Sequence, residues 1–570
     1  MTNDNDDLKQ TLHEAVSCHQ AGDLIEAERL YRRVLGEAPD HVDALNLLGV
    51  VAQQKGNLED ALSLFDRAMA AAPRLATIPF NKANALRDAE RNEDAIALYK
   101  TALDLDSHYT DARLNLGALL HERGHTQAAV AQFNALLKDA PDSAKGYYNL
   151  GKCRQTQGRL EDATQAIGKA IELDPEDPEA YFAQANVVAD MGLFEEAISH
   201  INKAIQLKPD WPEAYANWGN YLCDLDRQDE SLTLYDQAIN LNPPNETARA
   251  NKAFALLTLG KMREGWLDYH RRPLIAATHA HESLEKIPTW RNENLSDKKV
   301  LVVGEQGIGD EILFASMIRE FAELTEQCVL ACSPKLLAVL EHSFSDVPNL
   351  RFVSKDDISS PINNIDLQAT IIDIGQRCRP SLIKFPSPTS YLSSGKSQED
   401  ALRFRYKDLF GDRKPLVGIS WTSSNPTIGA QKTIPLEDWL SVLECRSVQF
   451  VNVQSDCKQT DLDSIPSRIR DKVYTDPDLD ITHDLLAALD QLAVMDLVIT
   501  CSNTTAHLAG ASGRPTWVLL PTGRARLWYW FKGQNPCPWY PNVKLMQKSV
   551  KSSWASMMKQ VAEKLSAAHD

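Results

Sequence analysis

Two short segments in the second half of the chain have the composition of anion-binding loops. The first, residues 304–311 (GEQGIGDE), separates an apolar run from a helical pattern, and the second, residues 502–507 (SNTTAH), follows a run that ends at Cys501. Backbone N–H groups and the helix dipole at such a turn favour a bound phosphate. Residues 304–311 are neither a GxGxxG fingerprint nor a P-loop. A tight turn with a helix cap is the alternative interpretation of these glycines, and a hydrogen bond within the core is the alternative for His507.

The elements that must position these loops are short, β-branched strands that alternate with helices. The predicted strands lie at residues 298–304, 328–332, 350–353 and 369–373, and then, after a proline- and serine-rich linker at about 384–411, at 415–421, 449–454, 496–501 and 516–521. Alternating strands and helices predict parallel sheets with crossover connections. Two such series in tandem predict two Rossmann-like domains that face a cleft.

The first half of the chain is organised by a repeat of 34 residues. Small residues recur at this spacing, each followed four positions later by a larger apolar residue, and prolines and glycines mark the ends and turns of the units. The small residues are Ala27, Ala61, Ala95, Ala129, Ala163, Ala197, Ser231 and Gly265. Pairs of antiparallel helices explain this pattern, because small residues let the helices approach and proline ends the second helix. The pattern resembles the tetratricopeptide repeat (TPR), which implies an all-α superhelix of eight units over residues 8–275 with a protein-binding groove.

Asparagine recurs at the sixth residue of the units. The predicted acceptor-binding residues are Asn81, Asn115, Asn149, Asn217 and Asn251, interrupted by Ala183. An amide offers both a donor and an acceptor, which suits it to an extended peptide backbone of any sequence. Such a ladder resembles the groove of the protein O-GlcNAc transferases. Local hydrogen bonding within each repeat is the alternative explanation.

Charge and composition restrict the class of protein. The net charge is −18, of which residues 1–270 carry −17, and this acidity disfavours nucleic acid or an anionic membrane as the partner of the repeats. The chain has no apolar run of about eighteen residues and no basic, apolar leader at its start, so neither a membrane span nor an export signal is expected. Ten scattered cysteines without a CxxC pair are expected to be buried free thiols rather than metal ligands, and together these features predict a cytoplasmic protein.

Three segments of the second half together resemble the heptosyltransferase-like glycosyltransferases. They are GEQGIGDEILFA (304–315), GISW with KTIPLEDW (418–439), and SNTTAHLAGASGRPTWVLLP (502–521) followed by PCPWYPNVKLMQ (536–547). The resemblance implies a GT-B unit, with an N-terminal Rossmann-like domain at 297–405 and a C-terminal nucleotide-sugar-binding domain at 412–570. A connector at 276–296 joins this unit to the repeats.

The resemblance also implies roles for particular residues. Asp310 matches the aspartate that acts as general base on the acceptor hydroxyl, with Glu311 as the alternative base and Glu305 as a weaker third; a helix cap is the other reading of Asp310. Lys432 matches the lysine of the family's K-x-W-P motif, here K-T-I-P, and is expected to pair with phosphate unless it is a surface lysine. The remaining expected nucleotide-sugar contacts are Gly307, Gly309, Thr427, Ser502, Asn503, Thr504, Thr505 and His507.

One departure and two further expectations concern the third segment and the chain end. Many relatives have Asp-Thr where this chain has Ser502-Asn503, so the preferred sugar and nucleotide stay open. The loop at 523–532 and Trp539-Tyr540 are expected to bring aromatic residues and arginines near the same cleft, where Arg524 and Arg526 would meet an acidic sugar or phosphate. Core packing between the domain and the C-terminal helix is the alternative role of the aromatic residues. The amphipathic segment 553–567 is expected to be a helix that crosses back onto the first α/β domain.

The sequence therefore predicts an inverting glycosyltransferase, independent of metal and of any cofactor. Its donor would be a CMP- or UDP-linked sugar, and its acceptor a serine or threonine of a protein held by the repeats. Resemblance to repeat-linked flagellin glycosyltransferases implies flagellin as the acceptor and a nonulosonic acid of the pseudaminic type as the sugar. Two alternatives remain open: a glycosyltransferase that acts on lipopolysaccharide or another glycan, and a repeat-based adaptor with a degenerate, non-catalytic GT-B fold.

Overall fold

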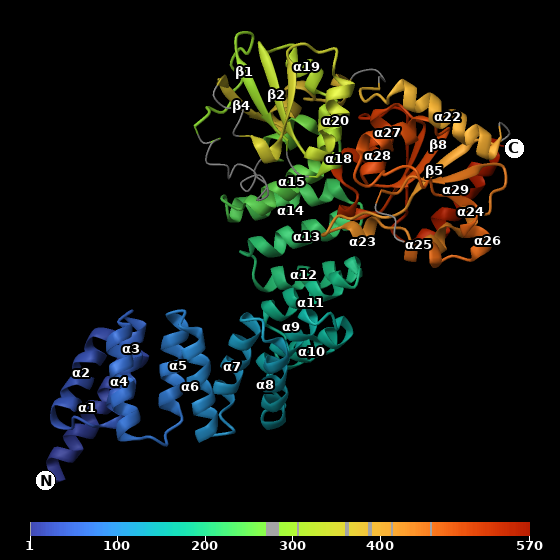
Figure 1. Cartoon of the computed structure of the whole chain (residues 1–570). Helices are drawn as coiled ribbons and strands as arrows, with labels where there is room; N and C mark the ends of the chain where they lie inside the picture. The colour runs from blue at the N-terminus through green and yellow to red at the C-terminus, as the bar shows by residue number, and fades with distance from the viewer. Residues whose placement is uncertain are drawn as a thin grey trace. The chain divides into compact units, whose positions relative to one another are not determined.

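The computed structural model describes residues 2–269, 284, 286–304, 307–358, 364–385, 390–411, 414–455 and 459–569. Its internal contacts divide the chain into two compact units, residues 1–209 and 210–570. Each unit is described by itself (Figure 1). The end of the predicted eighth repeat (270–275), residues 276–283 and 285 of the connector, and Glu305 lie outside the described residues.

The first unit consists of twelve described helices that pack as consecutive antiparallel pairs. They are α1 (Thr2–Gln20), α2 (Leu24–Glu37), α3 (Val42–Gln54), α4 (Leu58–Ala71), α5 (Thr77–Asp88), α6 (Asn92–Leu105), α7 (Thr110–Glu122), α8 (Thr126–Asp139), α9 (Ala144–Thr156), α10 (Leu160–Leu173), α11 (Pro178–Asp190) and α12 (Phe194–Leu207). Each helix contacts the next one along the chain, as stacked helical repeats require.

The 34-residue period explains how these helices pack. The alanines that begin the pattern are fully buried, and so are the aromatic residues four positions later. Phe65 shows why the first helix carries a glycine: a methyl group at Gly49 would lie 2.7 Å from the Phe65 ring. The same ring lies in a cluster with Ile78 of the next repeat, so each aromatic side chain joins its own repeat to its neighbour.

The second unit begins with four more helices and continues into two parallel sheets. The helices are α13 (Pro212–Asp224), α14 (Gln228–Leu241), α15 (Glu246–Thr258) and α16 (Met262–Tyr269). They continue the repeat pattern, and α13, α15 and α16 also contact elements of the α/β region. The last repeats and the α/β region therefore form one compact unit.

The first sheet has four parallel strands in the order β3-β2-β1-β4. Its strands are β1 (Lys299–Val303), β2 (Gln327–Cys332), β3 (Leu350–Ser354) and β4 (Leu367–Thr370), and its helices are α18 (Ile308–Ala315), α19 (Ile318–Ala322), α20 (Pro334–Ser343) and α21 (Ile371–Cys378). The predicted strand 369–373 is wrong at its end. Thr370 and Asp373 form a capping box that starts α21 after Thr370.

The second sheet has six parallel strands in the order β10-β9-β8-β5-β6-β7. They are β5 (Leu416–Ser420), β6 (Gln449–Asn452), β7 (Val473–Tyr474), β8 (Leu497–Cys501), β9 (Thr516–Leu520) and β10 (Val543–Gln547). The helices among them are α22 (Lys396–Phe410), α23 (Gly429–Lys432), α24 (Leu440–Leu443), α25 (Gln459–Asp463), α26 (Ser467–Arg470), α27 (Leu485–Ala493), α28 (Thr504–Ala511) and α29 (Trp554–His569), with short 3₁₀ turns η4 (Leu436–Trp439), η5 (Gly523–Ala525) and η6 (Trp528–Trp530). Counted along the domain, the strand order is 3-2-1-4-5-6, that of a doubly wound sheet.

Two helices pack differently from the sequence-based expectation. The C-terminal helix α29 does not cross back: it packs on α24 and η4, and Met558, Val561 and Leu565 lie in the core of the second sheet. Helix α22 lies in the segment assigned to the end of the first α/β domain and the linker. It contacts α27 of the second α/β domain, and its Tyr406 donates a hydrogen bond to Asp476 (2.8 Å). The chain therefore crosses into the second α/β domain before residue 396.

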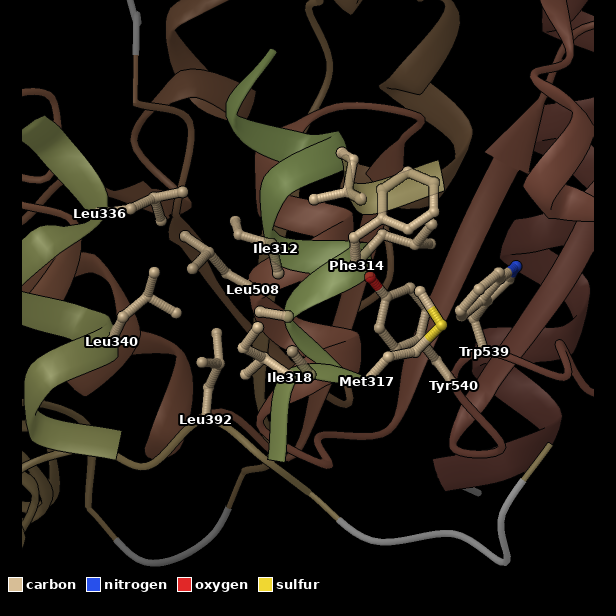
Figure 2. Close-up of a cluster of buried hydrophobic side chains, with 14 of the residues drawn as sticks. Ile312, Phe314, Met317, Ile318, Leu336, Leu340, Leu392, Leu508, Trp539 and Tyr540 are labelled. Carbon is tan, nitrogen blue, oxygen red and sulfur yellow. The ribbon is translucent and has the colours of Figure 1, made fainter. Parts of the chain in front are cut away.

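Helices α18 and α28 join the two α/β domains. They contact each other directly, and Ile312 and Phe314 of α18 lie in one buried cluster with Leu508 of α28 and Tyr540 (Figure 2). Helix α18 follows β1 and α28 follows β8. Each of these strands lies next to the point at which the strand order of its sheet reverses. This contact brings the two predicted anion-binding loops to the same place.

Candidate functional site

A cavity of about 370 Å³ lies where the loops after four strands meet one another and the segment after β9. Its wall comprises Gly307, Ile308, Gly309, Asp310, Thr422, Ser423, Ser424, Asn425, Pro426, Lys432, Gln454, Ser455, Ser502, Asn503, Thr504, His507, Leu527 and Tyr529. The loops follow β1, β5, β6 and β8, and β5 and β8 flank the reversal point of the six-stranded sheet. Ligands of doubly wound sheets bind in this position, outside the carboxyl ends of the strands.

Side-chain hydrogen bonds hold the loops of the second sheet in place. The Gln454 carbonyl oxygen accepts from the hydroxyl of Ser420 (2.7 Å) and from the backbone N–H groups of Trp421 and Thr422 (3.0 Å each). Asn503 donates to Ser420 Oγ (2.7 Å) and to the Thr422 carbonyl (2.9 Å), so it ties the end of β8 to the end of β5. The cavity wall is therefore pre-shaped by the protein itself.

Two helices present their N-terminal ends to the cavity. Gly307 is the N-cap of α18, and Asn503 is the N-cap of α28, where its side chain accepts from the Ala506 N–H. Gly309 lies so close to the His507 ring that an added methyl group would be 2.8 Å from Cδ2. Both helix ends contribute a partial positive charge to the same cavity, which favours an anionic ligand.

Asp310 and Lys432 place opposite charges in the wall. The Lys432 side chain is only 4% exposed, and its burial lowers the pKa of its ammonium group, while the charge of Asp310 acts in the opposite direction. Burial also raises the pKa of Tyr529 well above its ordinary value, with a further contribution from Asp310. A buried lysine that lines the same cavity as two helix N-termini is suited to a phosphate, because phosphate stabilises its charged form.

His507 is enclosed by aromatic rings. Its Nδ1 is 2.9 Å from the Tyr540 hydroxyl, and its ring stacks on Trp530 with centroids 5.2 Å apart and lies edge-on to Tyr529. Burial, and secondarily the charge of Lys432, lowers the pKa of His507 to about 3. The imidazole is therefore neutral near pH 7, so it can form hydrogen bonds with a ligand but contributes no positive charge.

The structure brings most, but not all, of the predicted site residues together. Gly307, Gly309, Asp310, Lys432, Ser502, Asn503, Thr504 and His507 all line the cavity. Three others do not. Glu311 pairs with Lys355 and accepts from the Ser333 N–H (2.8 Å), Thr505 donates to the Val453 carbonyl (3.2 Å), and Thr427 is exposed beside the cavity loop.

Arg524 and Arg526 do not serve the role expected of them. Arg524 pairs with Asp224 (2.7 Å) and Arg526 with Asp226 (2.8 Å), both at the end of α13. The Arg526 side chain is fully buried in this contact. These arginines therefore bind the seventh repeat. The sequence did not predict these ion pairs, because each arginine lies 300 positions from its acidic partner.

Several cavity residues were not predicted. Gln454 and Ser455 follow the predicted strand 449–454, and their position after a parallel strand was a usable signal. Thr422, Ser423, Ser424 and Asn425 follow β5 in the same way. Tyr529 and Leu527 come from the loop after β9, at residues 523–532, which was expected near the cleft for its aromatic residues and arginines but not for these two side chains in particular.

The predicted acceptor-binding asparagines are all partly exposed. Three of them donate to an asparagine of the preceding repeat: Asn81 to Asn46 (3.1 Å), Asn115 to Asn84 (3.0 Å) and Asn251 to Asn220 (3.0 Å). Asn149 donates to the Lys145 carbonyl (2.9 Å). Local hydrogen bonding thus accounts for part of this pattern, and the partial exposure leaves the side chains within reach of a bound chain.

The nine described cysteines are free thiols, and seven of them are buried. Among the described residues, no group of three or more His, Cys, Asp or Glu side chains is placed to hold a metal ion. No described helix is both long and apolar enough to cross a membrane.

Comparison with known protein families identifies repeats in the N-terminal part of the chain. Sequence models of the tetratricopeptide repeat match residues 19–76, 86–151, 144–177 and 178–210. The N-terminal part of the chain is therefore built of tetratricopeptide repeats, as predicted, and the structure continues the same helix pairing through α16.

One curated relative extends beyond any single repeat. Protein FlbA of Caulobacter vibrioides is 28% identical over 329 residues, which cover 55% of this chain and 54% of that protein. The chain thus matches about half the length of this relative. Among solved structures, the chain is similar to a tetratricopeptide repeat protein from Parabacteroides merdae (18% identity, TM-score 0.36). The match covers 44% of this chain and 98% of that protein's chain. YrrB, described as a TPR protein with an unusual peptide-binding site (26% identity, TM-score 0.28), matches 32% of this chain and 95% of its own.

Proposed function

We propose that this protein is an inverting glycosyltransferase that transfers a sugar from a nucleotide-sugar to a serine or threonine of a protein held by its repeats. The observation that carries the proposal is the cavity between the two parallel sheets, where Asp310, Lys432 and two helix N-termini lie in one wall. Two doubly wound domains that face such a cavity correspond to the GT-B architecture implied by the sequence resemblance.

The donor is expected to bind through its phosphate. The N-termini of α18 and α28 and the Lys432 ammonium group supply positive potential, and the hydroxyls of Ser502 and Thr504 supply hydrogen-bond donors. The same groups would stabilise the negative charge that develops on the leaving nucleotide. Because the loops are already tied by Gln454 and Asn503, little reorganisation is required at the moment of transfer.

The acceptor is expected to be activated by Asp310. Its carboxylate would take the proton of the acceptor hydroxyl while the oxygen forms a bond to the anomeric carbon and the nucleotide phosphate leaves with the electron pair. Glu311 is the weaker candidate for this role, because Lys355 and the Ser333 N–H already engage its carboxylate outside the cavity.

The repeats are the proposed binding site for the acceptor protein. Tetratricopeptide repeats present long surfaces of paired helices, and the partly exposed asparagines can bond to a peptide backbone. The specific proposal, flagellin modified with a CMP-linked nonulosonic acid, rests on the sequence resemblance alone.

The test is intact-mass spectrometry of flagellin co-expressed with this protein and the enzymes that make a CMP-linked nonulosonic acid. Asp310→Asn preserves the shape of the side chain and removes the base, so we expect at least a hundredfold loss of modification. Asp297→Asn is the matched control, because Asp297 is exposed and remote from the cavity wall. A mass increment in the wild type and in the control, but not in Asp310→Asn, is the predicted result.

Each alternative function has its own outcome in this experiment. Modification of lipopolysaccharide with unchanged flagellin would replace the protein acceptor with a glycan. Full modification by Asp310→Asn would remove Asp310 from the mechanism. Unmodified flagellin and glycan, together with an absence of nucleotide binding, would leave a repeat-based adaptor.

A further inference from the structure

One turn position of the repeats has a left-handed backbone in every unit. It is occupied by Gly22, Gly56, Glu90, Gly124, Gly158, Gly192, Asp226 and Gly260, all with φ between 59° and 81°. Glycine adopts this conformation without cost, whereas other residues lose about 1 kcal/mol or more. Glu90 and Asp226 are the two exceptions to glycine at this position, and the contacts of their side chains distinguish them.

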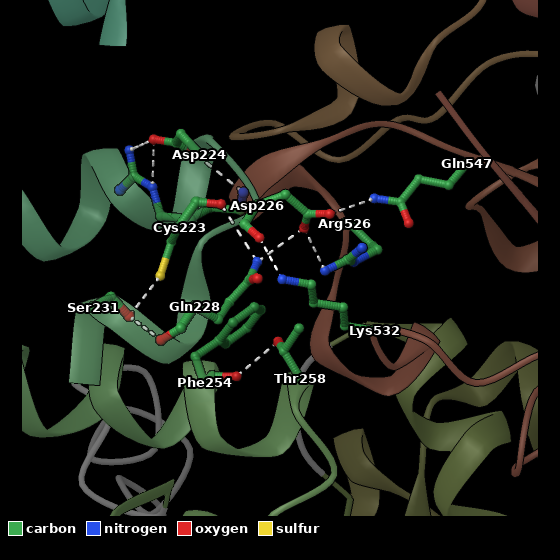
Figure 3. A network of polar contacts seen from close by, with 11 residues as sticks. Cys223, Asp224, Asp226, Gln228, Ser231, Phe254, Thr258, Arg526, Lys532 and Gln547 are labelled. Carbon is green, nitrogen blue, oxygen red and sulfur yellow. Dashed lines mark hydrogen bonds and ion pairs between the residues drawn. The ribbon is translucent and has the colours of Figure 1, made fainter. Parts of the chain in front are cut away.

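Asp226 has partners that explain its presence. Its carboxylate accepts from the fully buried Arg526 (2.8 Å), from Gln547 (3.3 Å) and from Gln228 (3.1 Å), and its backbone carbonyl accepts from the Lys532 ammonium group (Figure 3). By contrast, Glu90 is exposed, and no hydrogen bond or ion pair of its side chain is found among the described residues. Of the two non-glycine residues at this left-handed position, Asp226 of the seventh repeat contacts the α/β region and Glu90 of the third does not.

Two of the partners of Asp226, Arg526 and Lys532, belong to one segment, residues 523–532, which we name the bridging loop. Its first residue packs on the same helix end: a methyl group at Gly523 would lie 2.8 Å from the Asp224 Cα atom. Arg524 adds an ion pair with Asp224 (2.7 Å) and a backbone hydrogen bond to the same carboxylate (3.0 Å). The loop ends where the Lys532 N–H donates to the Thr258 carbonyl (2.8 Å).

The middle of the bridging loop forms part of the cavity. Leu527 and Tyr529 line it directly. Trp530 donates from its indole to Ser502 Oγ (2.8 Å) and stacks on His507, so it also supports two further cavity residues. Trp528 donates to the Tyr269 hydroxyl of α16 (2.7 Å). One continuous set of contacts therefore runs from the turn of the seventh repeat to the wall of the cavity.

We propose that Asp226 is a positioning residue through which the last repeats hold the wall of the donor cavity in its binding shape. This inference rests on the proposed function of that cavity as a nucleotide site.

The test compares two substitutions at the same turn position in the full-length protein. Both Asp226→Gly and Glu90→Gly relieve the left-handed backbone, but only the first removes the contacts to the bridging loop. Affinities for CMP and for UDP are measured by calorimetry. We expect about tenfold weaker binding in Asp226→Gly, as when only a tenth of the molecules hold the binding-competent shape, and a change below twofold in Glu90→Gly. Asp226→Asn, which tolerates the same backbone without the charge, should weaken binding in the same direction by less.

A second measurement separates positioning from general loss of stability. Val561→Ala creates a cavity in the core of the second sheet, remote from the bridging loop, and lowers stability without altering the loop. Amide hydrogen exchange at residues 502–507, without nucleotide, should rise at least fivefold in Asp226→Gly and stay within twofold in Val561→Ala and Glu90→Gly.

The outcomes distinguish this inference from the proposed function. If the wild type binds neither CMP nor UDP, the proposed donor site fails, and the exchange comparison still tests whether Asp226 shapes residues 502–507. Unchanged exchange and affinity in Asp226→Gly would overturn the positioning role. Equal changes in Val561→Ala and Asp226→Gly would also overturn it, because they would reduce the effect to loss of stability.

Discussion

The third and seventh repeats are built alike inside and differ outside. In the third, Tyr99 donates to Asn84 (2.6 Å), which also accepts from Asn115 of the next repeat; in the seventh, Tyr235 donates to Asn220 (2.9 Å), which also accepts from Asn251. The tyrosine of each set is buried, and the contact joins consecutive repeats. This polar clamp is therefore common to both repeats and does not distinguish them.

The difference between the two repeats lies in what their turns contact. Glu90 of the third repeat is exposed, whereas Asp226 of the seventh is bonded to the bridging loop. The eighth repeat departs further, because Trp266 and Tyr269 of α16 pack on aromatic rings of the α/β region. A residue that departs from the repeat pattern is therefore informative where its side chain contacts the α/β region, as Asp226 and Trp266 do. The departure alone, as at Glu90, is not informative.

The largest effect is expected when the third repeat is compared with the eighth. The two differ at one position of the second helix, which is Ile96 in the third repeat and Trp266 in the eighth. Trp266 is 1% exposed, donates to the Arg379 carbonyl (2.9 Å) and fills the space above Gly375. We expect Trp266→Ala to lower the free energy of unfolding of the second unit by about 4 kcal/mol, and Ile96→Ala to lower that of the first unit by about 3 kcal/mol.

Intrinsic fluorescence measures this contrast, because all eleven tryptophans lie between residues 211 and 554, in the second unit. Trp266→Ala should shift the fluorescence-detected urea transition to lower concentration, whereas Ile96→Ala should shift the circular dichroism transition and leave the fluorescence transition in place. An unchanged fluorescence transition in Trp266→Ala would show that α16 is not part of the core of the second unit.

A medium-sized effect is expected from acid. The pKa of His507 is lowered to about 3 in the folded protein, so below pH 6.5 the unfolded chain binds a proton that the folded chain does not. Stability should therefore fall as the pH decreases from 6.5 towards 3, by about 2 kcal/mol between pH 7 and pH 5. The fluorescence-detected transition of His507→Gln should lack this part of the acid sensitivity.

The matched control is His121→Gln in the fourth repeat, since burial also lowers the pKa of His121. Because His121 belongs to the first unit, its replacement should leave the acid sensitivity of the fluorescence transition unchanged. An equal acid sensitivity in the wild type and in His507→Gln would contradict the buried, neutral imidazole at the cavity.

The smallest effect tests what the two repeats share. Tyr99→Phe and Tyr235→Phe each remove one hydrogen bond to an asparagine, and each should cost about 1 kcal/mol in the unit that contains it. Circular dichroism follows the first substitution, and fluorescence follows the second. A loss in Tyr235→Phe several times that in Tyr99→Phe would mean that the clamp of the seventh repeat does more than join repeats.

The repeats could be predicted almost residue by residue, because a fixed period repeats the same packing problem eight times. The cavity was predictable in part for a similar reason: the carboxyl ends of parallel strands meet at one edge, so loops after strands converge wherever the strands are recognised. That rule covers the loops that carry Asp310 and Ser502, whereas Lys432 was assigned from the family resemblance, and all three line the cavity. The rule extends to Gln454 after β6, which was not predicted.

The remainder depended on contacts between distant residues. Arg526 and Asp226 are 300 positions apart, so the pairing had no local signature. The amphipathic face of α29 predicted a helix but could not say which sheet it covers. The early end of β4, in contrast, has a local signal in the sequence, since Thr370 and Asp373 have the spacing of a capping box.

The most direct test of the donor site is calorimetric titration of CMP and UDP into the wild type, Lys432→Met and Lys559→Met. Lys432 is buried in the cavity wall, whereas Lys559 is exposed on α29 and serves as the matched control. The donor-site proposal predicts that at least one nucleotide binds to the wild type and to Lys559→Met, and that Lys432→Met binds it at least tenfold more weakly. Equal affinity in all three proteins, or no binding of either nucleotide to the wild type, would contradict it.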